Sequence, residues 1–125
     1  MAHKKVEYNS NEHNAWIRGL EFYGQELGFP TERLQEIATD NTKDEALQGV
    51  ENFQDQFIIH QRQIDDLKND IHQFLNGVAN QIESTGLVDE RCLAEKAALR
   101  ERYVTEEKLF NEMRHEFYRF AEEWM

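Results

Sequence analysis

The segment "ENFQDQFIIHQRQIDDL", residues 51–67, decides the fold. Apolar residues return in it at alternating steps of three and four, which is the spacing of one buried face of an α-helix. The same spacing continues on both sides, from Ala46 to Val78. One position of this series holds a polar residue, His60. The pattern predicts a long helix over about residues 42–83, roughly 60 Å in length at 1.5 Å per residue.

The ends of this helix carry recognisable signals. Thr42 followed three residues later by Glu45 is the pattern of a capping box, in which each side chain binds a backbone amide of the first turn. Gly86 can take the left-handed conformation that ends a helix, and Asp89 can cap the next one. A third helix is therefore predicted over about residues 89–124. Its buried positions are Cys92, Leu99, Tyr103, Glu106, Phe110, Met113, Phe117, Phe120 and Trp124.

A first helix is predicted over about residues 10–39, with Ser10 or Asn11 as its cap. Its apolar positions are Trp16, Leu20, Tyr23, Leu27, Leu34 and Ile37. Gly28 and Pro30 interrupt it, yet the apolar spacing continues in phase on both sides. This indicates a kink or a short break between two roughly collinear halves, with a full change of direction as the alternative. Residues 1–9 show no periodicity and are expected to be flexible.

Three amphipathic helices joined by short connections pack as antiparallel neighbours. The predicted fold is all-α: an elongated up-down-up three-helix bundle or coiled coil, forming one domain over residues 10–125. The net charge of −11 repels phosphate backbones and anionic lipid, so neither a nucleic acid nor a membrane is an expected partner. Cys92 is the only cysteine, which excludes an internal disulfide and fits a cytoplasmic location.

Four polar residues at buried positions are predicted to fix the register of the bundle: His13, Tyr23, His60 and Glu106. Taking the turn centres as reference, residue i of the first helix lies opposite roughly residue 82 − i of the second, and residue j of the second opposite roughly 172 − j of the third. This estimate pairs His13 with Glu106 and His60 with Tyr23. A buried polar pair disfavours slipped packing at some cost in stability, so replacing His60 with Leu is expected to raise the melting temperature.

A metal-binding or redox module of the helical-bundle class is the first alternative. Such sites use Glu-x-x-His pairs from two helices at one level. The chain has a single pair of this kind, Glu112 and His115, on the outer side of the third helix. We therefore predict no metal and no other cofactor. A Gly-rich phosphate loop is also missing from the sequence, and Cys92 occupies a packing position, so the protein is not expected to be an enzyme.

Apolar residues outside the buried faces indicate a surface for association. Phe22 and Phe29 lie seven residues apart on the outer side of the first helix, and Ile58 and Ile59 lie outside the buried face of the second. The register estimate places Ile59 level with Phe22. Exposed apolar clusters often mark interaction sites. The predicted function is therefore protein–protein association, through a homodimer or a docked partner, with an acidic antagonist of a basic partner as a further alternative.

Overall fold

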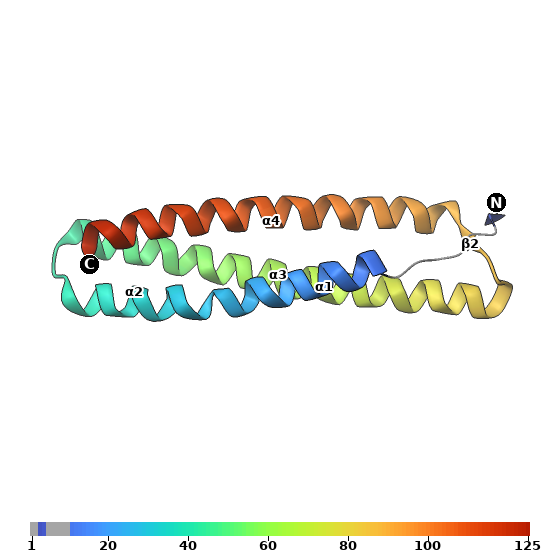
Figure 1. Cartoon of the computed structure of the whole chain (residues 1–125), viewed down its shortest axis with the longest axis horizontal. Helices are drawn as coiled ribbons and strands as arrows, with labels where there is room; N and C mark the ends of the chain where they lie inside the picture. Colours follow the sequence, from blue (N-terminus) through green and yellow to red (C-terminus); the bar gives the residue numbers. More distant parts are fainter. Residues whose placement is uncertain (1–2, 5–10) are drawn as a thin grey trace.

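The computed structural model describes residues 3–4 and 11–125, and its helices form one elongated bundle (Figure 1). The first two helices follow each other in one direction, the third runs back along them, and the fourth returns beside both. The predicted all-α, up-down-up arrangement is confirmed. The four helices are α1 (Asn11–Glu26), α2 (Gly28–Asp40), α3 (Asp44–Thr85) and α4 (Glu90–Trp124).

The junction of α1 and α2 is a bend of 18° rather than a turn. Pro30 has no backbone N–H to bond the carbonyl four residues earlier, and this interrupts the helical hydrogen-bond series. Leu27 nevertheless keeps a right-handed helical conformation, and its carbonyl accepts a bond from the Thr31 N–H at 3.1 Å. The two halves stay nearly collinear, so the predicted kink is confirmed and the full change of direction is wrong.

The turn between α3 and α4 has the predicted geometry. Gly86 has a φ of 71°, in the left-handed region that glycine adopts without strain, and its N–H bonds the carbonyl of Ile82 at 2.8 Å. The Asp89 carboxylate accepts a hydrogen bond from the backbone N–H of Cys92 at 2.9 Å and so caps α4. Both end signals in this part of the sequence are confirmed.

The capping box predicted at Thr42 and Glu45 is wrong. The residue that precedes α3 is Lys43, and its side chain makes no capping hydrogen bond. Because the helix begins two residues later than predicted, the Thr42 side chain lies outside the first turn. Asp44 and Glu45 in that turn instead place negative charge near the positive end of the helix dipole.

A short antiparallel pairing joins the N-terminal segment to the α3–α4 turn. Strand β1 (His3–Lys4) pairs with β2 (Val88–Asp89), with His3 opposite Asp89. His3 and Lys4 are thus placed in a strand, and the expected flexibility of residues 1–9 stays a prediction. Backbone hydrogen bonds make this pairing, and such bonds leave no side-chain pattern in the sequence. The remaining residues of 1–9 and the predicted Ser10 cap lie outside the described part of the chain.

The core follows the apolar periodicity closely. Every position predicted on the buried face of α3 is buried, including His60. Leu20 of α1, Ile71 of α3 and Phe110 of α4 are among the most completely buried side chains. Within residues 3–4 and 11–125, no helix combines the length and the apolar character that crossing a membrane requires.

Two glycines of α3 provide a test of helix packing. A Cβ atom at Gly49 would collide with the Phe120 ring, whereas a Cβ atom at Gly77 meets nothing within 4 Å. We expect Gly77→Ala to raise the free energy of unfolding by about 0.5–1 kcal/mol through helix propensity. Gly49→Ala gains the same propensity but should lower stability by about 1 kcal/mol, because the Phe120 ring has to move. Urea unfolding followed by circular dichroism measures both, and equal stabilisation would contradict the packing described here.

Candidate functional site

The principal polar contact in the core joins α3 to α4. His60 Nδ1 and Glu106 Oε1 share a hydrogen bond of 2.6 Å, and both side chains are almost entirely buried. The Phe110 ring packs edge-on against the His60 imidazole. Both residues are among the four predicted to fix the register, but the predicted partners are wrong. His60 binds Glu106, and neither Tyr23 nor His13 takes part in this bond.

Tyr23 bonds a different residue of α4. Its hydroxyl donates to Glu107 Oε2 at 2.8 Å, and its ring packs against Phe110. Burial, together with the hydrogen bond to the Glu107 carboxylate, raises the pKa of Tyr23 well above its usual value. Tyr23 therefore stays neutral and links α1 to α4, rather than to His60 on α3.

His13 is fully buried among aromatic rings. Its imidazole packs edge-on against Trp16 and stacks on Phe74 of α3. Burial lowers the pKa of His13, and the positive charge of nearby Lys96 lowers it further, so the neutral imidazole is favoured. The predicted pair with Glu106 is wrong because α1 lies along α4 with a different offset: Lys96, rather than Glu106, is level with His13.

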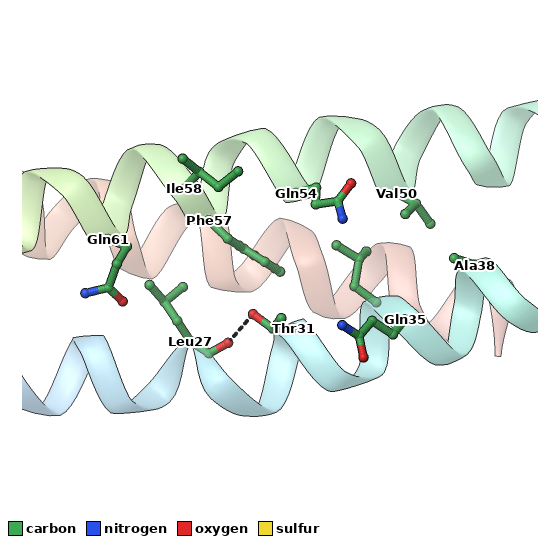
Figure 2. A pocket seen from close by; sticks show the side chains of 10 residues that line it. Leu27, Thr31, Gln35, Ala38, Val50, Gln54, Phe57, Ile58 and Gln61 are labelled. Atoms are coloured by element: carbon green, nitrogen blue, oxygen red, sulfur yellow. Dashed lines mark hydrogen bonds between the residues drawn. The ribbon is translucent and has the colours of Figure 1, made fainter.

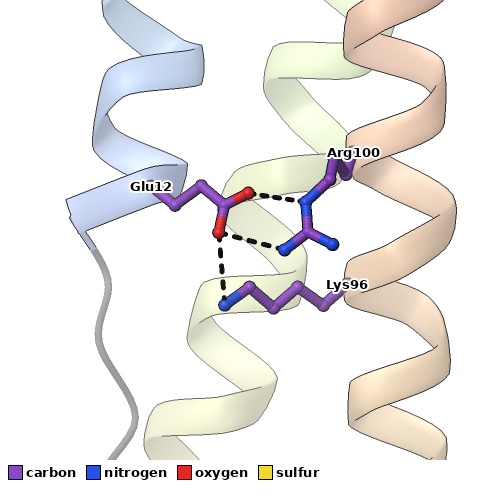
Figure 3. Close-up of polar contacts among 3 residues, drawn as sticks. All are labelled: Glu12, Lys96 and Arg100. Atoms are coloured by element: carbon purple, nitrogen blue, oxygen red, sulfur yellow. Dashed lines mark hydrogen bonds and ion pairs between the residues drawn. The ribbon is translucent and has the colours of Figure 1, made fainter.

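A cluster of charged side chains fastens the start of α1 to α4 (Figure 3). Arg100 donates two hydrogen bonds to the Glu12 carboxylate, at 2.6 and 3.1 Å, and Lys96 Nζ lies 3.5 Å from it. The hydrogen bond from Arg100 lowers the pKa of Glu12. Because these groups are substantially exposed, Glu12 contributes less than about 1 kcal/mol to stability. We interpret the cluster as a structural contact between α1 and α4 rather than as a reactive centre.

The residues that could bind a metal or act as a nucleophile are dispersed. In the described part of the chain, no group of three or more His, Cys, Asp or Glu side chains is placed to hold a metal ion. Cys92 is half-buried, and its thiol donates a hydrogen bond to Gln81 Oε1. Burial raises the pKa of this thiol, and the nearby Asp89 carboxylate raises it further. This favours the thiol over the reactive thiolate.

A groove with a mostly apolar floor lies between α2 and α3 (Figure 2). Its volume is about 380 Å³. Figure 2 shows Leu27 and Phe57 pointing into the space between the two helices from opposite sides. The Thr31 hydroxyl donates to the carbonyl of Leu27 at 2.6 Å, so the hydroxyl is satisfied within its own helix. The lining residues are Leu27, Thr31, Leu34, Gln35, Ala38, Val50, Gln54, Phe57, Ile58 and Gln61.

The lining of the groove combines a buried apolar floor with neutral polar side chains around it. Leu27, Leu34, Val50 and Phe57 are buried and form the floor, whereas the half-exposed Ile58 lies at the edge. Gln61 Nε2 donates to Asp65 Oδ1 at 3.1 Å, one turn further along α3. No charged residue lines the groove itself. The arrangement can hold apolar side chains, while the side-chain amides of Gln35 and Gln54 can bond polar groups or water.

The four residues predicted to form an association patch are all about half exposed, but only Ile58 lines the groove. Ile59 projects about 100° away from Ile58 around the helix axis, toward a different side of α3. Phe22 and Phe29 lie on the outer side of α1 and α2 and do not line the groove.

The predicted alignment of Phe22 with Ile59 is also wrong. The estimate places residue 61 opposite Glu21, whereas Glu21 approaches Lys68 at 4.0 Å. Lys68 lies seven residues, about two helical turns, beyond the position that the estimate gives. Phe29, rather than Phe22, is the phenylalanine nearer the level of Ile58 and Ile59.

Sequence reasoning missed most of the groove for an identifiable reason. Its floor consists of residues correctly assigned to the core, and its walls include Thr31, Ala38 and Gln54, which carry no apolar signal. Small and neutral residues facing each other on α2 and α3 were the available clue. That clue depends on the alignment of the two helices, which the sequence left uncertain.

Comparison with known proteins gives no match: no protein-family model, no curated protein and no solved structure is significantly similar to this chain.

Proposed function

We propose that this protein acts by non-enzymatic association, holding one amphipathic helix of another polypeptide in the groove between α2 and α3. The observation that carries the proposal is the apolar floor of this groove, formed by Leu27, Leu34, Val50 and Phe57 and extended to the surface by Ile58. Two parallel or antiparallel helices with a groove between them can accept the apolar stripe of a third. The cytoplasm is the proposed setting, in keeping with the single cysteine.

The size of the groove fits this occupant. The α2 side extends from Leu27 to Ala38, which at 1.5 Å per residue is roughly 17 Å, or about three helical turns. A partner helix of that length presents three or four apolar side chains along one stripe. Each side chain that becomes fully buried contributes roughly 1.5–3 kcal/mol before the cost of association.

The test uses a synthetic amphipathic peptide about 18 residues long, with a leucine stripe and uncharged glutamine and serine flanks. We expect it to bind the protein in fluorescence anisotropy. Ile58→Glu should weaken binding at least roughly tenfold, since a charge would be buried at the edge of the groove. Val104→Glu is the matched control, because Val104 on α4 is also β-branched and is exposed to 56%, against 54% for Ile58.

Ala38→Trp, which fills the groove from the α2 side, is a second variant with the same expected effect. Circular dichroism establishes that each variant keeps its helices. Absence of peptide binding to the wild-type protein, or equal binding to all four proteins, would contradict the proposed function.

Self-association is the second candidate, and the half-exposed Phe22 and Phe29 favour it. A twofold dimer would bury the same surface on both subunits. Light scattering at increasing concentration should then report twice the monomer mass, and Phe22→Glu with Phe29→Glu should return the monomer. A wild-type protein that stays monomeric at high concentration would eliminate this candidate.

A further inference from the structure

We infer that the groove between α2 and α3 selects a basic amphipathic helix, one that carries lysine or arginine on both sides of its apolar stripe. This inference rests on the proposed function and adds the chemistry of the partner. It is carried by the distribution of charge around the groove, whose lining is uncharged while its edges are acidic.

The α3 edge carries a carboxylate two turns before and two turns after Ile58, although Arg62 lies between Ile58 and Asp65. Glu51 and Asp65 lie seven residues before and after Ile58, which places all three on one stripe of the helix. Both carboxylates are on exposed residues, and Asp65 is tied to the groove through its hydrogen bond with Gln61. A helix lying against Ile58 would therefore have negative charge near both of its ends on this side.

The α2 edge has the same sign. A shallow hollow next to the groove shares the lining residue Gln35 with it and is otherwise lined by Glu32, Glu36, Thr39 and Asp40. Between residues 27 and 65 the chain carries eight acidic and three basic side chains. Of the three basic residues, Arg33 already pairs with Glu36 at 3.4 Å and lies over the Phe29 ring.

The same charge argues against a second copy as the occupant of the groove. Each copy carries a net charge of −11, so the acidic edges of the groove disfavour a second copy of the chain as its occupant. A basic helix is attracted instead, and its flanking cations meet the two acidic edges as its stripe enters the groove. Because the edges are exposed, this attraction should weaken as the salt concentration rises.

The experiment compares three peptides that share one leucine stripe and differ only in their flanks, which are lysine, glutamine or glutamate. A fourth peptide with the composition of the lysine peptide but a scrambled order controls for attraction without amphipathic periodicity. On the wild-type protein, we expect the lysine peptide to bind roughly tenfold more tightly than the glutamine peptide and the glutamate peptide to bind most weakly. The scrambled peptide should bind weakly.

Reversing the charge of acidic residues tests whether the groove edges cause the preference for lysine flanks. Glu51→Lys with Asp65→Lys should abolish or invert the preference for lysine flanks. Glu112→Lys with Glu116→Lys changes the net charge by the same amount on exposed residues of α4 and should leave the preference intact. Circular dichroism and the glutamine peptide verify that both pairs of substitutions leave the fold and the groove unchanged.

The outcomes separate this inference from the proposed function. Equal binding of the three peptides, or an equal loss of preference in both charge-reversal proteins, would overturn the basic partner while leaving the groove as a binding site. A dimer that Ile58→Glu disrupts would identify a second copy as the occupant and overturn the inference too. If no peptide binds, both the inference and the proposed function fall.

Discussion

Replacing His60 with leucine is expected to lower the free energy of unfolding by about 3 kcal/mol, because the substitution leaves Glu106 buried without its partner. For a chain of this length, the melting temperature should fall by roughly 10 °C. The bond between the two side chains is 2.6 Å long, and both are almost entirely buried. Thermal and urea unfolding followed by circular dichroism measure the change.

The double substitution His60→Leu with Glu106→Leu is the matched control. It removes both polar groups together, so no buried carboxylate is left unpaired, and stability should return to the wild-type value or exceed it. A stabilising effect of His60→Leu alone would show that Glu106 reaches water or another donor without His60. That result would contradict the contact between α3 and α4.

Truncation of Phe117 is expected to have the second large effect. Its side chain is 1% exposed, and its ring packs edge-on against Phe53 and at a steep angle against Phe57, with centroids 5.4 Å apart in both pairs. Phe117→Ala should lower the free energy of unfolding by about 4 kcal/mol, through lost burial and the cavity left between α3 and α4.

Phe29→Ala is the comparison for this truncation. The Phe29 side chain is about half exposed and contacts the Arg33 guanidinium, an interaction worth at most about 1 kcal/mol at the surface. Chemical denaturation of the two variants should therefore differ by about 3 kcal/mol. Similar losses would mean that the two rings have similar surroundings, against the description of Phe29 as a residue available for association.

The buried face of each helix could be predicted from the sequence because the geometry of an α-helix is fixed. Side chains at steps of three and four share one face whatever the helix packs against. Leu20, Ile64 and Phe110 were assigned to the core on that basis, and all three are buried. The roles of Gly86 and Asp89 could also be predicted. A left-handed glycine and a capping carboxylate each form hydrogen bonds with residues only a few positions away in the sequence.

Contacts between helices could not be predicted with the same accuracy. The partner of His60 depends on how far α4 is shifted along α3 and on its rotation about its own axis. The register estimate places His60 level with about Met113 of α4, and a shift of about two turns brings Glu106 to that level instead. This also reverses the expected effect of His60→Leu, since a buried carboxylate without a partner costs far more than a tyrosine hydroxyl that can turn elsewhere.

Prediction of the candidate site also required knowledge of the contacts between helices. Ile58 was found because it is an apolar residue outside the buried face of its helix. Ala38 and Gln54 become groove residues through the placement of α2 beside α3, and no local pattern marks them. The acidic edges were visible only as part of a diffuse negative charge until Glu51 and Asp65 were placed beside the groove.

The most direct test of the binding groove is a titration of the isotope-labelled protein with the lysine-flanked peptide, followed by backbone amide chemical shifts. We expect the largest chemical-shift changes in residues 27–38, at and within α2, and in residues 50–61 of α3. The change at Ile58 should be among the largest. Val104 and the neighbouring outer side of α4 should change little. Shifts concentrated on α4, or spread evenly over the acidic surface, would show that the peptide does not occupy the groove.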